Sequence, residues 1–223
     1  NNCQDCYKCI RECPVKAIRI ENSRASIIEE RCISCGHCTV VCPSGAKRYH
    51  SDLSLVESWI DRGDEVVLSV APSIYSFFKG SQQEVVSHLL SLGFSKVSET
   101  AWGALDTSQL TTDWLKSYTG NLAISSACPA IVALVKMYYP QFASSLAPVA
   151  SPMIMHSKRL RDLTGNATRI VFAGPCIAKK LEAKCDGGPD AVITFSELLQ
   201  MVPFNPANPR DNAAWFQIGR AHV

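Results

Sequence analysis

The sequence predicts two unlike parts, a small cysteine-rich α+β module followed by an α/β domain with a largely parallel sheet. Three observations predict this division. Eight of the 11 cysteines lie between Cys3 and Cys42, at repeated spacings. From residue 65 onward, short apolar runs alternate with amphipathic stretches of helical period. The 223 residues are 47% hydrophobic and 19% charged, a composition typical of a folded globular chain.

Net charge and hydropathy argue against two classes of partner. The formal charge of +2, from 22 basic and 20 acidic residues, gives no strong field for nucleic acid or for an anionic membrane. The most apolar stretch, 131–139, contains Lys136 and is shorter than the roughly 18 residues that a spanning helix needs. The chain starts without methionine and without a secretory signal. We therefore expect a cytoplasmic protein whose gene continues upstream.

The cysteines of the first part form two copies of one motif. The first copy is Cys3, Cys6, Cys9 and Cys13 before Pro14, and the second is Cys32, Cys35, Cys38 and Cys42 before Pro43. The spacing between successive cysteines is the same in both copies. The similarity continues into 15–20 and 44–49, so a whole structural unit is duplicated.

This spacing is suited to a four-iron cubane. Three thiolates, each separated by two residues, bind three irons, and in paired sites the fourth thiolate comes from the other repeat. We therefore expect one cluster on Cys3, Cys6, Cys9 and Cys42, and a second on Cys32, Cys35, Cys38 and Cys13. Structural zinc or a thiol scaffold is the alternative, although zinc does not need a third cysteine at this spacing. His37 is expected to be solvated or to donate to sulfur, because the cysteine set is complete without it.

Residues 1–50 resemble the bacterial two-cluster ferredoxin. The resemblance implies a module that transfers one electron at a time. Fifty residues cannot bury two clusters deeply, so we expect fast electron exchange with a redox partner protein, acting as donor or acceptor. We expect neither nucleic acid nor membrane as a partner.

The pattern after residue 50 predicts a connecting helix over 51–64, with apolar residues at helical spacing up to Ile60 and a stop at Gly63. A strand over 65–70 follows. The next helix begins at Ser81, which can form a capping box with Glu84, and ends at Gly93. His88 on this helix is expected to face solvent.

Strands and helices continue to alternate along the remaining sequence. We expect strands over 96–99, 122–125, 169–173 and 191–194, and helices over 106–118, after Pro129 and over 153–163. Such alternation favours a parallel sheet covered by helices. In sheets of this kind ligands bind beyond the carboxyl ends of the strands.

Two cysteines follow predicted strands at those ends. Cys128 lies in 125–130 (SSACPA) and Cys176 in 172–182 (FAGPCIAKKLE). A thiol at the start of a helix is biased toward thiolate by the helix dipole, which suits metal ligation or nucleophilic chemistry. Packing as a small apolar side chain is the alternative for each cysteine.

These two segments resemble two of the three active-site signatures of the iron-only (FeFe) hydrogenase large subunit, and the similarity extends from 65 to about 218. The resemblance implies that Cys128 and Cys176 bind a third cubane, joined to a two-iron subsite with carbonyl, cyanide and a bridging dithiolate. It implies that Lys179 donates to a cyanide, that Glu182 belongs to the same signature and that Ser151 lines the pocket. An ammonium group is a suitable donor to a cyanide nitrogen.

The sequence departs from that family at functional positions. Ala127 stands where active hydrogenases have a proton-relaying cysteine, and Gly174 stands where they have a methionine beside the dithiolate. An acidic relay is not evident over 103–112, and the third signature, with two further cubane cysteines, is missing. Cys185 alone cannot replace them. The pattern is similar to the divergent, sensory branches of the family.

The last six residues, 218–223 (IGRAHV), resemble the translation of a sequencing adapter, so we expect the natural protein to continue past Gln217. Six ordinary residues are the alternative. The expected domains are a ferredoxin domain over 1–50, a connecting helix over 51–64 and a hydrogenase-like domain over 65–217.

Together these features predict a cytoplasmic iron–sulfur protein of an anaerobe, in which two front clusters feed a hydrogenase-like domain. The expected chemistry is proton reduction, hydrogen oxidation or redox sensing in a longer chain, with the present stretch inactive by itself. One alternative is a non-enzymatic electron carrier or cluster-assembly factor related to hydrogenases. Another is an α/β binding domain in which Cys128 and Cys176 only pack.

Overall fold

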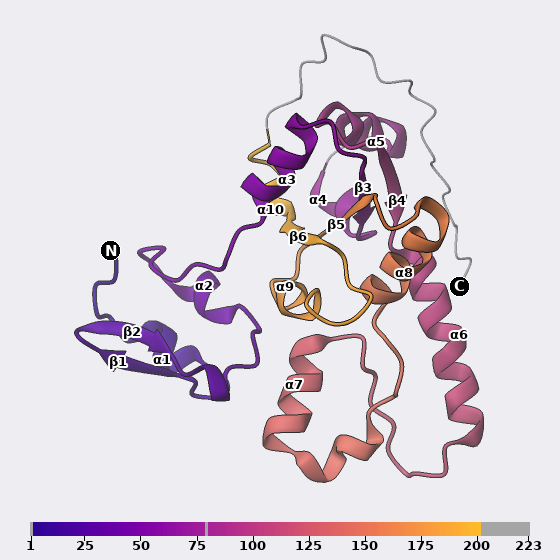
Figure 1. Cartoon of the computed structure of the whole chain (residues 1–223). Coiled ribbons are helices and arrows are strands. Elements are labelled where there is room, and N and C mark those ends of the chain that lie inside the picture. Colours follow the sequence, from indigo (N-terminus) through magenta and orange to yellow (C-terminus); the bar gives the residue numbers. More distant parts are fainter. Residues whose placement is uncertain (1, 79, 202–223) are drawn as a thin grey trace.

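The computed structural model describes residues 2–78 and 80–201. The expected domain end at 217 and the six adapter-like residues after it lie outside the described residues. The front module and the α/β domain are distinct in Figure 1, joined by a single segment that leads into α3. Among the described residues, no helix is long and apolar enough to cross a membrane.

The front module is built from one short helix per repeat and one two-stranded ribbon. Helix α1 (Lys8–Glu12) belongs to the first repeat and α2 (His37–Val41) to the second. Between them, β1 (Ile18–Glu21) and β2 (Arg24–Ile27) pair antiparallel, and the 3-10 helix η1 (Glu29–Arg31) follows. The two helices contact each other, so the repeats form one unit.

The duplication seen in the sequence is also present in the backbone. Positive φ angles occur at three pairs of equivalent positions in the two repeats: Asp5 and Ser34, Tyr7 and Gly36, and Lys16 and Gly45. In both repeats the last cysteine accepts a hydrogen bond from the backbone N–H four residues later, at 3.3 Å from Ala17 to Cys13 and from Ala46 to Cys42. The two loops therefore fold in the same way around their thiols.

The second part contains a four-stranded parallel sheet, as predicted. Its strands are β3 (Val66–Val70), β4 (Lys96–Glu99), β5 (Arg169–Gly174) and β6 (Ala191–Thr194), in the order β4-β3-β5-β6. All three pairings are parallel. Because β3 and β5 are central, both of their faces are buried, which explains their continuous apolar sequences.

Successive residues of β3 point to opposite faces of the sheet and show which helices cover each face. Leu68 belongs to an apolar cluster shared with α3 (Leu53–Asp61), α4 (Ile74–Phe77), α5 (Gln82–Ser91) and α10 (Phe195–Leu198). Val67 faces the other way and packs with Leu160 of α8 (Pro152–Thr164). Helix α6 (Ala101–Ser117) in turn packs on α8. The sheet therefore lies between two helical layers.

Most predicted elements are present, with bounds shifted by a few residues. The connecting helix is α3, and the Ser81–Glu84 capping box of α5 is confirmed. Helix α6 begins at Ala101 rather than at 106, since Gly103 does not break it. A Cβ at this glycine would lie 2.1 Å from the carbonyl oxygen of Pro152, so glycine permits the close approach of α6 and α8.

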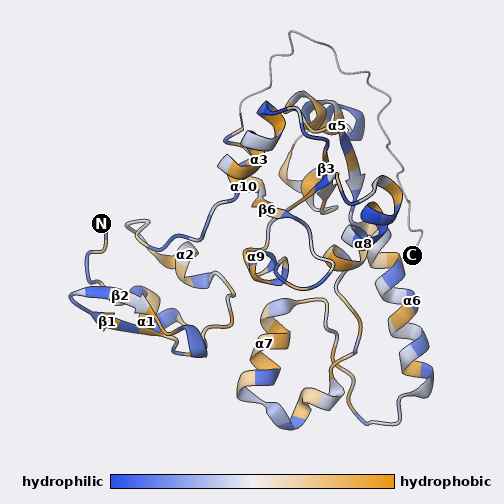
Figure 2. Cartoon of the chain, viewed as in Figure 1, coloured by the Kyte–Doolittle hydropathy of each residue, from blue (hydrophilic) through white to orange (hydrophobic). Residues whose placement is uncertain are grey.

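The strand expected over 122–125 is wrong. Ile124 forms one isolated bridge with Leu146, through two backbone hydrogen bonds of 2.8 Å. In the described part of the chain no neighbouring strand extends this pairing, and the side chain of Leu122 is exposed. After it, α7 (Pro129–Tyr138) begins at the proline as expected, and the 3-10 helix η2 (Pro140–Ser145) follows. Figure 2 shows α7 largely in the hydrophobic colours, whereas α6 alternates between hydrophilic and hydrophobic.

Candidate metal centres

The first predicted ligand set lines a cavity in the front module. The cavity has a volume of about 360 Å³, and its walls include Cys3, Cys6, Cys9 and Cys42. Three of these cysteines come from the first repeat and one from the second. Asp5 and Lys47 also line it, which places one acidic and one basic residue beside the thiols.

The second set lies on the side of the module that packs against α7. Cys13, Cys32 and Cys38 belong to one apolar cluster, which also contains Ile33. Cys35 is exposed. The contact between α1 and α2 brings the last cysteine of the first repeat toward the second repeat.

Hydrogen bonds and burial act in opposite directions on the thiols of the first set. A hydrogen bond from the Ser44 hydroxyl lowers the pKa of Cys42 to about 7, and backbone N–H groups make smaller contributions in the same direction. Backbone hydrogen bonds, first from Ala25, also lower the pKa of Cys3. Burial instead raises the pKa of Cys9. Since metals bind thiolates, the hydrogen-bonded cysteines are the more readily deprotonated candidate ligands.

The cysteines surround a space and do not converge on one point. In the part of the chain that the structure describes, no three His, Cys, Asp or Glu side chains are grouped for a single metal ion. A cubane requires a different arrangement, because each of its four irons takes its own thiolate. A cavity with cysteines on its walls fits that requirement.

The second candidate centre lies where α7 and α9 (Ala178–Glu182) begin. Cys128 is the N-cap of α7, directly before Pro129, and Cys176 follows the end of β5 by two residues. Helices α7 and α9 contact each other. The carboxyl end of β5 therefore carries Cys176 to the sheet edge, as the parallel fold predicts, whereas Cys128 reaches the site from a loop.

Lys179 connects the two cysteine segments. Its ammonium group donates to the backbone oxygen of Ala127 at 3.1 Å and to Glu182 Oε2 at 2.6 Å. The side chains of Lys179 and Glu182 are only 13% and 11% exposed. Pairing with Glu182 offsets the desolvation of the ammonium group, which lies beside the residue that precedes Cys128.

The hydroxyl of Ser151 is a buried polar group without a hydrogen-bond partner among the described residues. This residue is the N-cap of α8 and is 2% exposed. Its hydroxyl makes no cap hydrogen bond and no other hydrogen bond to a described residue. An unpaired buried hydroxyl is costly, so this position favours a bound polar group in that place.

The two departures from the hydrogenase pattern also have structural consequences. A Cβ at Gly174 would lie 2.7 Å from the ring of Phe172, so this ring takes the space in which a longer side chain would begin. Ala127 contributes its backbone oxygen to Lys179 but has no group that could carry a proton.

The front module contacts the α/β domain through residues of both repeats. Gly36 faces Ile177, and a Cβ at this glycine would lie 2.8 Å from Ile177 Cδ1. Ile177 directly follows Cys176. On α7, Tyr138 donates from its hydroxyl to the backbone oxygen of Arg31 at 2.7 Å. Ala133 and Leu134 pack on the apolar cluster that contains Cys13, Cys32 and Cys38.

The remaining residues singled out in the sequence lie apart from these centres. His37 is about half exposed, and its Nε2 lies 3.9 Å from Glu12 Oε2. His88 is exposed as predicted, with its ring 5.9 Å from that of Phe78. Cys185 is an exposed thiol after α9.

Two polar clusters were missed in the sequence analysis. His156 is 1% exposed on α8, with ring nitrogens 2.7 Å from Ser69 Oγ and 3.0 Å from Ser98 Oγ. Its position on the apolar side of the helix was the available signal. Thr194 and Glu197 form a capping box that also holds the linker between the two parts, and their T-x-x-E spacing was readable.

The two cysteine sets and the parallel sheet beside them define an iron–sulfur electron-transfer protein with a hydrogenase-like domain. Comparison with known families agrees with this class. The chain belongs to the iron only hydrogenase large subunit family, since residues 64–211 match its C-terminal domain. Residues 2–46 match the 4Fe-4S dicluster domain, so the front module is a ferredoxin domain with two 4Fe–4S clusters. Both predicted resemblances and the predicted fold class are confirmed.

Two relatives are subunits of a hydrogenase and of an oxidoreductase complex. The chain is 26% identical over 205 residues to the NADP-reducing hydrogenase subunit HndD of Solidesulfovibrio fructosivorans, covering 77% of this chain and 35% of the relative. It is 46% identical over 44 residues to a subunit of the ion-translocating oxidoreductase complex of Methanosarcina acetivorans, covering 20% of this chain and 17% of the relative. The chain thus spans about a third or less of the length of these relatives.

Proposed function

We propose that this protein passes electrons through its two front clusters to or from a third metal centre at Cys128 and Cys176. The observation that carries the proposal is the contact of Gly36 with Ile177, because it puts the second cysteine repeat beside the residue that follows Cys176. The cluster of the second set would then be the inner one. The cluster of the first set, in its cavity at the far side, would be the outer one.

The ligand sets proposed for the front clusters follow the two repeats. Cys3, Cys6, Cys9 and Cys42 would hold the outer cluster, which is supported by their common cavity. Cys32, Cys35, Cys38 and Cys13 would hold the inner cluster. Three of them lie in the apolar cluster that packs against α7, which also contains Cys9 of the first set. Such clusters supply reversible one-electron transfer when bound.

Cys128 and Cys176 would supply two thiolates to a third cubane. A hydrogenase-type group at this place would add a two-iron subsite for hydrogen chemistry. Lys179 is placed to donate to a polar ligand near Ala127, and Ser151 offers a buried hydroxyl without a partner among the described residues. Glu182 would hold the ammonium group of Lys179 in position.

Proton transfer is the step that these residues support least. Ala127 cannot carry a proton, and Phe172 fills the space beside Gly174. We therefore propose slow hydrogen turnover or redox sensing, as in the divergent branch of the family, in a cytoplasmic protein that exchanges electrons with a redox partner. A carrier or assembly factor without the two-iron subsite is the second candidate, which the Phe172 packing favours.

Iron and acid-labile sulfide per chain, measured on anaerobically purified protein, test the proposal. We expect about eight irons for the present chain and about twelve or more for a chain extended along its gene past Gln217. Cys128→Ser should lower the extended chain toward eight, whereas the matched Cys185→Ser should leave it unchanged. About eight irons in both chains would contradict a third centre.

Infrared spectra of the matured extended chain separate the two candidate functions. Carbonyl and cyanide bands would support the hydrogenase-type group. Twelve irons without such bands would support the carrier or assembly factor.

A further inference from the structure

We infer that Lys180 is a positioning residue that holds the inner front cluster at a fixed place relative to Cys176. It does so by tying the segment 49–52, which leaves the front module, to α9, which follows Cys176. The inference rests on the proposed electron path, since a fixed separation matters only if electrons pass between these centres.

Lys180 contacts residues of the α/β domain and residues of the linker 49–52, and we call this place the junction. Its ammonium group donates to the backbone oxygen of Val192 in β6 and lies 3.2 Å from a carboxylate oxygen of Glu197. It also lies 3.7 Å from Asp52 Oδ2 and 5.5 Å from the centre of the Tyr49 ring. The side chain is only 11% exposed. One buried cation therefore joins α9, β6, α10 and the linker.

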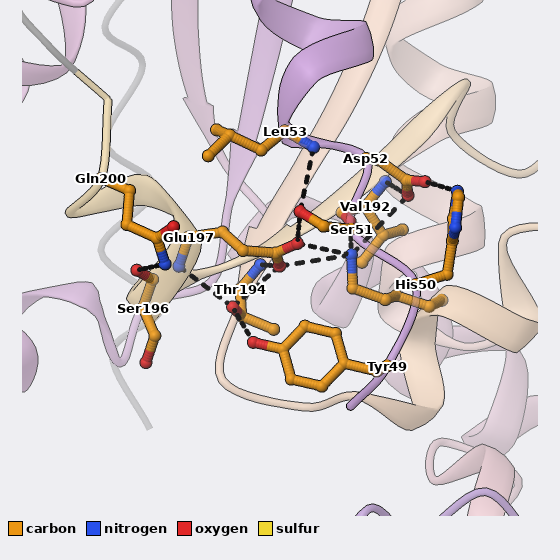
Figure 3. Close-up of polar contacts among 11 residues, drawn as sticks. Tyr49, His50, Ser51, Asp52, Leu53, Val192, Thr194, Ser196, Glu197 and Gln200 are labelled. Carbon is orange, nitrogen blue, oxygen red and sulfur yellow. Dashed lines mark hydrogen bonds and ion pairs between the residues drawn. The ribbon is translucent and has the colours of Figure 1, made fainter. Parts of the chain in front are cut away.

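The linker has its own hydrogen bonds to the same place, drawn in Figure 3. Asp52 Oδ2 accepts from the backbone N–H of Val192 at 3.0 Å. The hydroxyls of Tyr49 and Thr194 are 3.0 Å apart, and Ser51 donates to Glu197. Three side chains of this short segment thus bind the carboxyl end of β6 and the helix that follows it.

Glu197 holds this junction together from the side of the α/β domain. Its carboxylate accepts from the backbone N–H of Thr194 at 2.6 Å and from the Thr194 hydroxyl at 2.8 Å. Burial alone would raise the pKa of Glu197, but bonds from Ser51 and Thr194, together with the charge of Lys180, lower it. The carboxylate is therefore ionised and fully paired, and Lys180 is the cation that two nearby carboxylates share.

Neighbouring lysines of α9 reach in different directions. Lys179 donates toward the Cys128 segment, whereas Lys180 donates toward the linker of the front module. Since α9 has five residues, it cannot move one contact without disturbing the other. Helix α9 therefore links the position of the third centre to the position of the front module.

A local role in the β6–α10 turn is the competing explanation. That turn already has a complete capping box, formed by Thr194 and Glu197 without Lys180. Asp52 and Tyr49 belong to the linker and are not members of the capping box. The contacts of Lys180 with these two residues distinguish a link between the two parts from a local one.

Trypsin cleavage after Arg48, in the present chain carrying its front clusters, tests the link directly. Lys180→Met should speed this cleavage at least about tenfold, because proteolysis reports opening of the cleaved segment. Lys184→Met, the same change at an exposed lysine after the helix, should not change it. Lys180→Arg should restore slow cleavage, since it keeps the charge.

The two carboxylates left by Lys180→Met could unfold the turn, so Tyr49→Phe serves as the second variant. It removes only the hydroxyl bond to Thr194 and should also speed cleavage, to a smaller extent. Unchanged cleavage in Lys180→Met would overturn the inference, whatever the result for Tyr49→Phe. Faster cleavage at sites throughout the chain would overturn it as well, because it would mean general destabilisation.

The positioning role has a spectroscopic readout in the extended chain. With all clusters reduced, magnetic interaction between the inner cluster and the third centre should broaden their paramagnetic resonance signals. Lys180→Met should weaken this broadening while iron content stays the same, and Lys184→Met should not. If the third centre is absent, the iron count reports that failure separately, and the cleavage result still decides whether the link exists.

Discussion

In the described part of the front module, Cys9 and Cys13 share a small buried cluster with four apolar residues, Val15, Ala17, Ile18 and Ile33. The α/β domain instead buries a large apolar cluster between β3–β6 and four helices. Both parts carry cysteines that we propose as metal ligands. In the front module the cysteines take the place of a core, whereas in the α/β domain a core already exists and the cysteines lie at its edge.

This difference indicates where each part obtains its stability. A chain of about 50 residues buries too little apolar surface to fold securely without help, and metal ligation can supply the missing free energy. Among the described residues, the non-glycine residues with positive φ all lie between Asp5 and Ser34. Their strained backbone lowers the stability of the front module further. The α/β domain needs no metal to explain its sheet. We therefore expect the two parts to respond differently to the same perturbation.

Removal of the clusters should produce the largest difference. Treatment with an iron chelator and an oxidant should abolish hydrogen-exchange protection of β1 and β2, because the thiolate–iron bonds that close both loops are lost. Protection of β3 and β5 should remain. Hydrogen exchange followed by mass spectrometry measures both regions in one sample.

The same experiment on Cys9→Ala provides the control, since this change should remove one cluster without an oxidant. Equal loss of protection in both regions would contradict the comparison, because it would mean that the α/β domain also depends on the front clusters.

Leu68→Ala should have the opposite regional effect. Leu68 is fully buried on the central strand β3, and the lost contacts and cavity should lower the free energy of unfolding of the α/β domain by about 2–5 kcal/mol. The paramagnetic resonance signals of the front clusters should be unchanged. Urea unfolding followed by tryptophan fluorescence measures the loss, and Leu199→Ala, at an exposed leucine, is the matched control. A loss of front-cluster signal in Leu68→Ala would contradict independence of the two parts.

The sequence predicted these two regions to different extents. Cysteine spacing predicted the class of the front module and its two clusters, since a cubane permits few arrangements of thiolates. Apolar runs predicted the parallel strands, because central strands are buried on both faces. The strand over 122–125 failed, since an apolar run does not say whether a neighbouring strand exists. The contacts of Lys180 could not be predicted, because they join elements that are far apart in the chain and that only the tertiary fold brings together.

Acid should weaken the α/β domain through His156. Burial, with a contribution from the charge of Arg159, lowers its pKa from 6.5 to about 4, so the folded protein keeps the ring neutral between Ser69 and Ser98. At pH values between about 4 and 6.5, the His156 ring is protonated in the unfolded chain but neutral in the folded protein. Stability should therefore be complete above pH 6.5 and fall by about 3 kcal/mol as the pH approaches 4.

Urea unfolding at pH 7 and at pH 4.5 measures this dependence, again by tryptophan fluorescence. His156→Gln should be less stable at pH 7 but should lose most of the change between the two pH values. A wild-type dependence that persists in His156→Gln would assign the effect to other groups.

The smallest expected effect concerns the turn between β1 and β2 in the front module. Asn22 and Ser23 both have positive φ, at 49° and 57°, as a two-residue hairpin turn requires. Glycine adopts this conformation without strain, so Ser23→Gly should stabilise the ribbon by about 0.5 kcal/mol and slow exchange of its amides about twofold. Ser23→Ala lacks this benefit and should not slow exchange. Once the clusters are removed, Ser23→Gly should no longer protect the ribbon from exchange, because so small a backbone gain cannot replace the iron–thiolate bonds. A ribbon that stays protected without iron would show that the front module has a stable fold of its own.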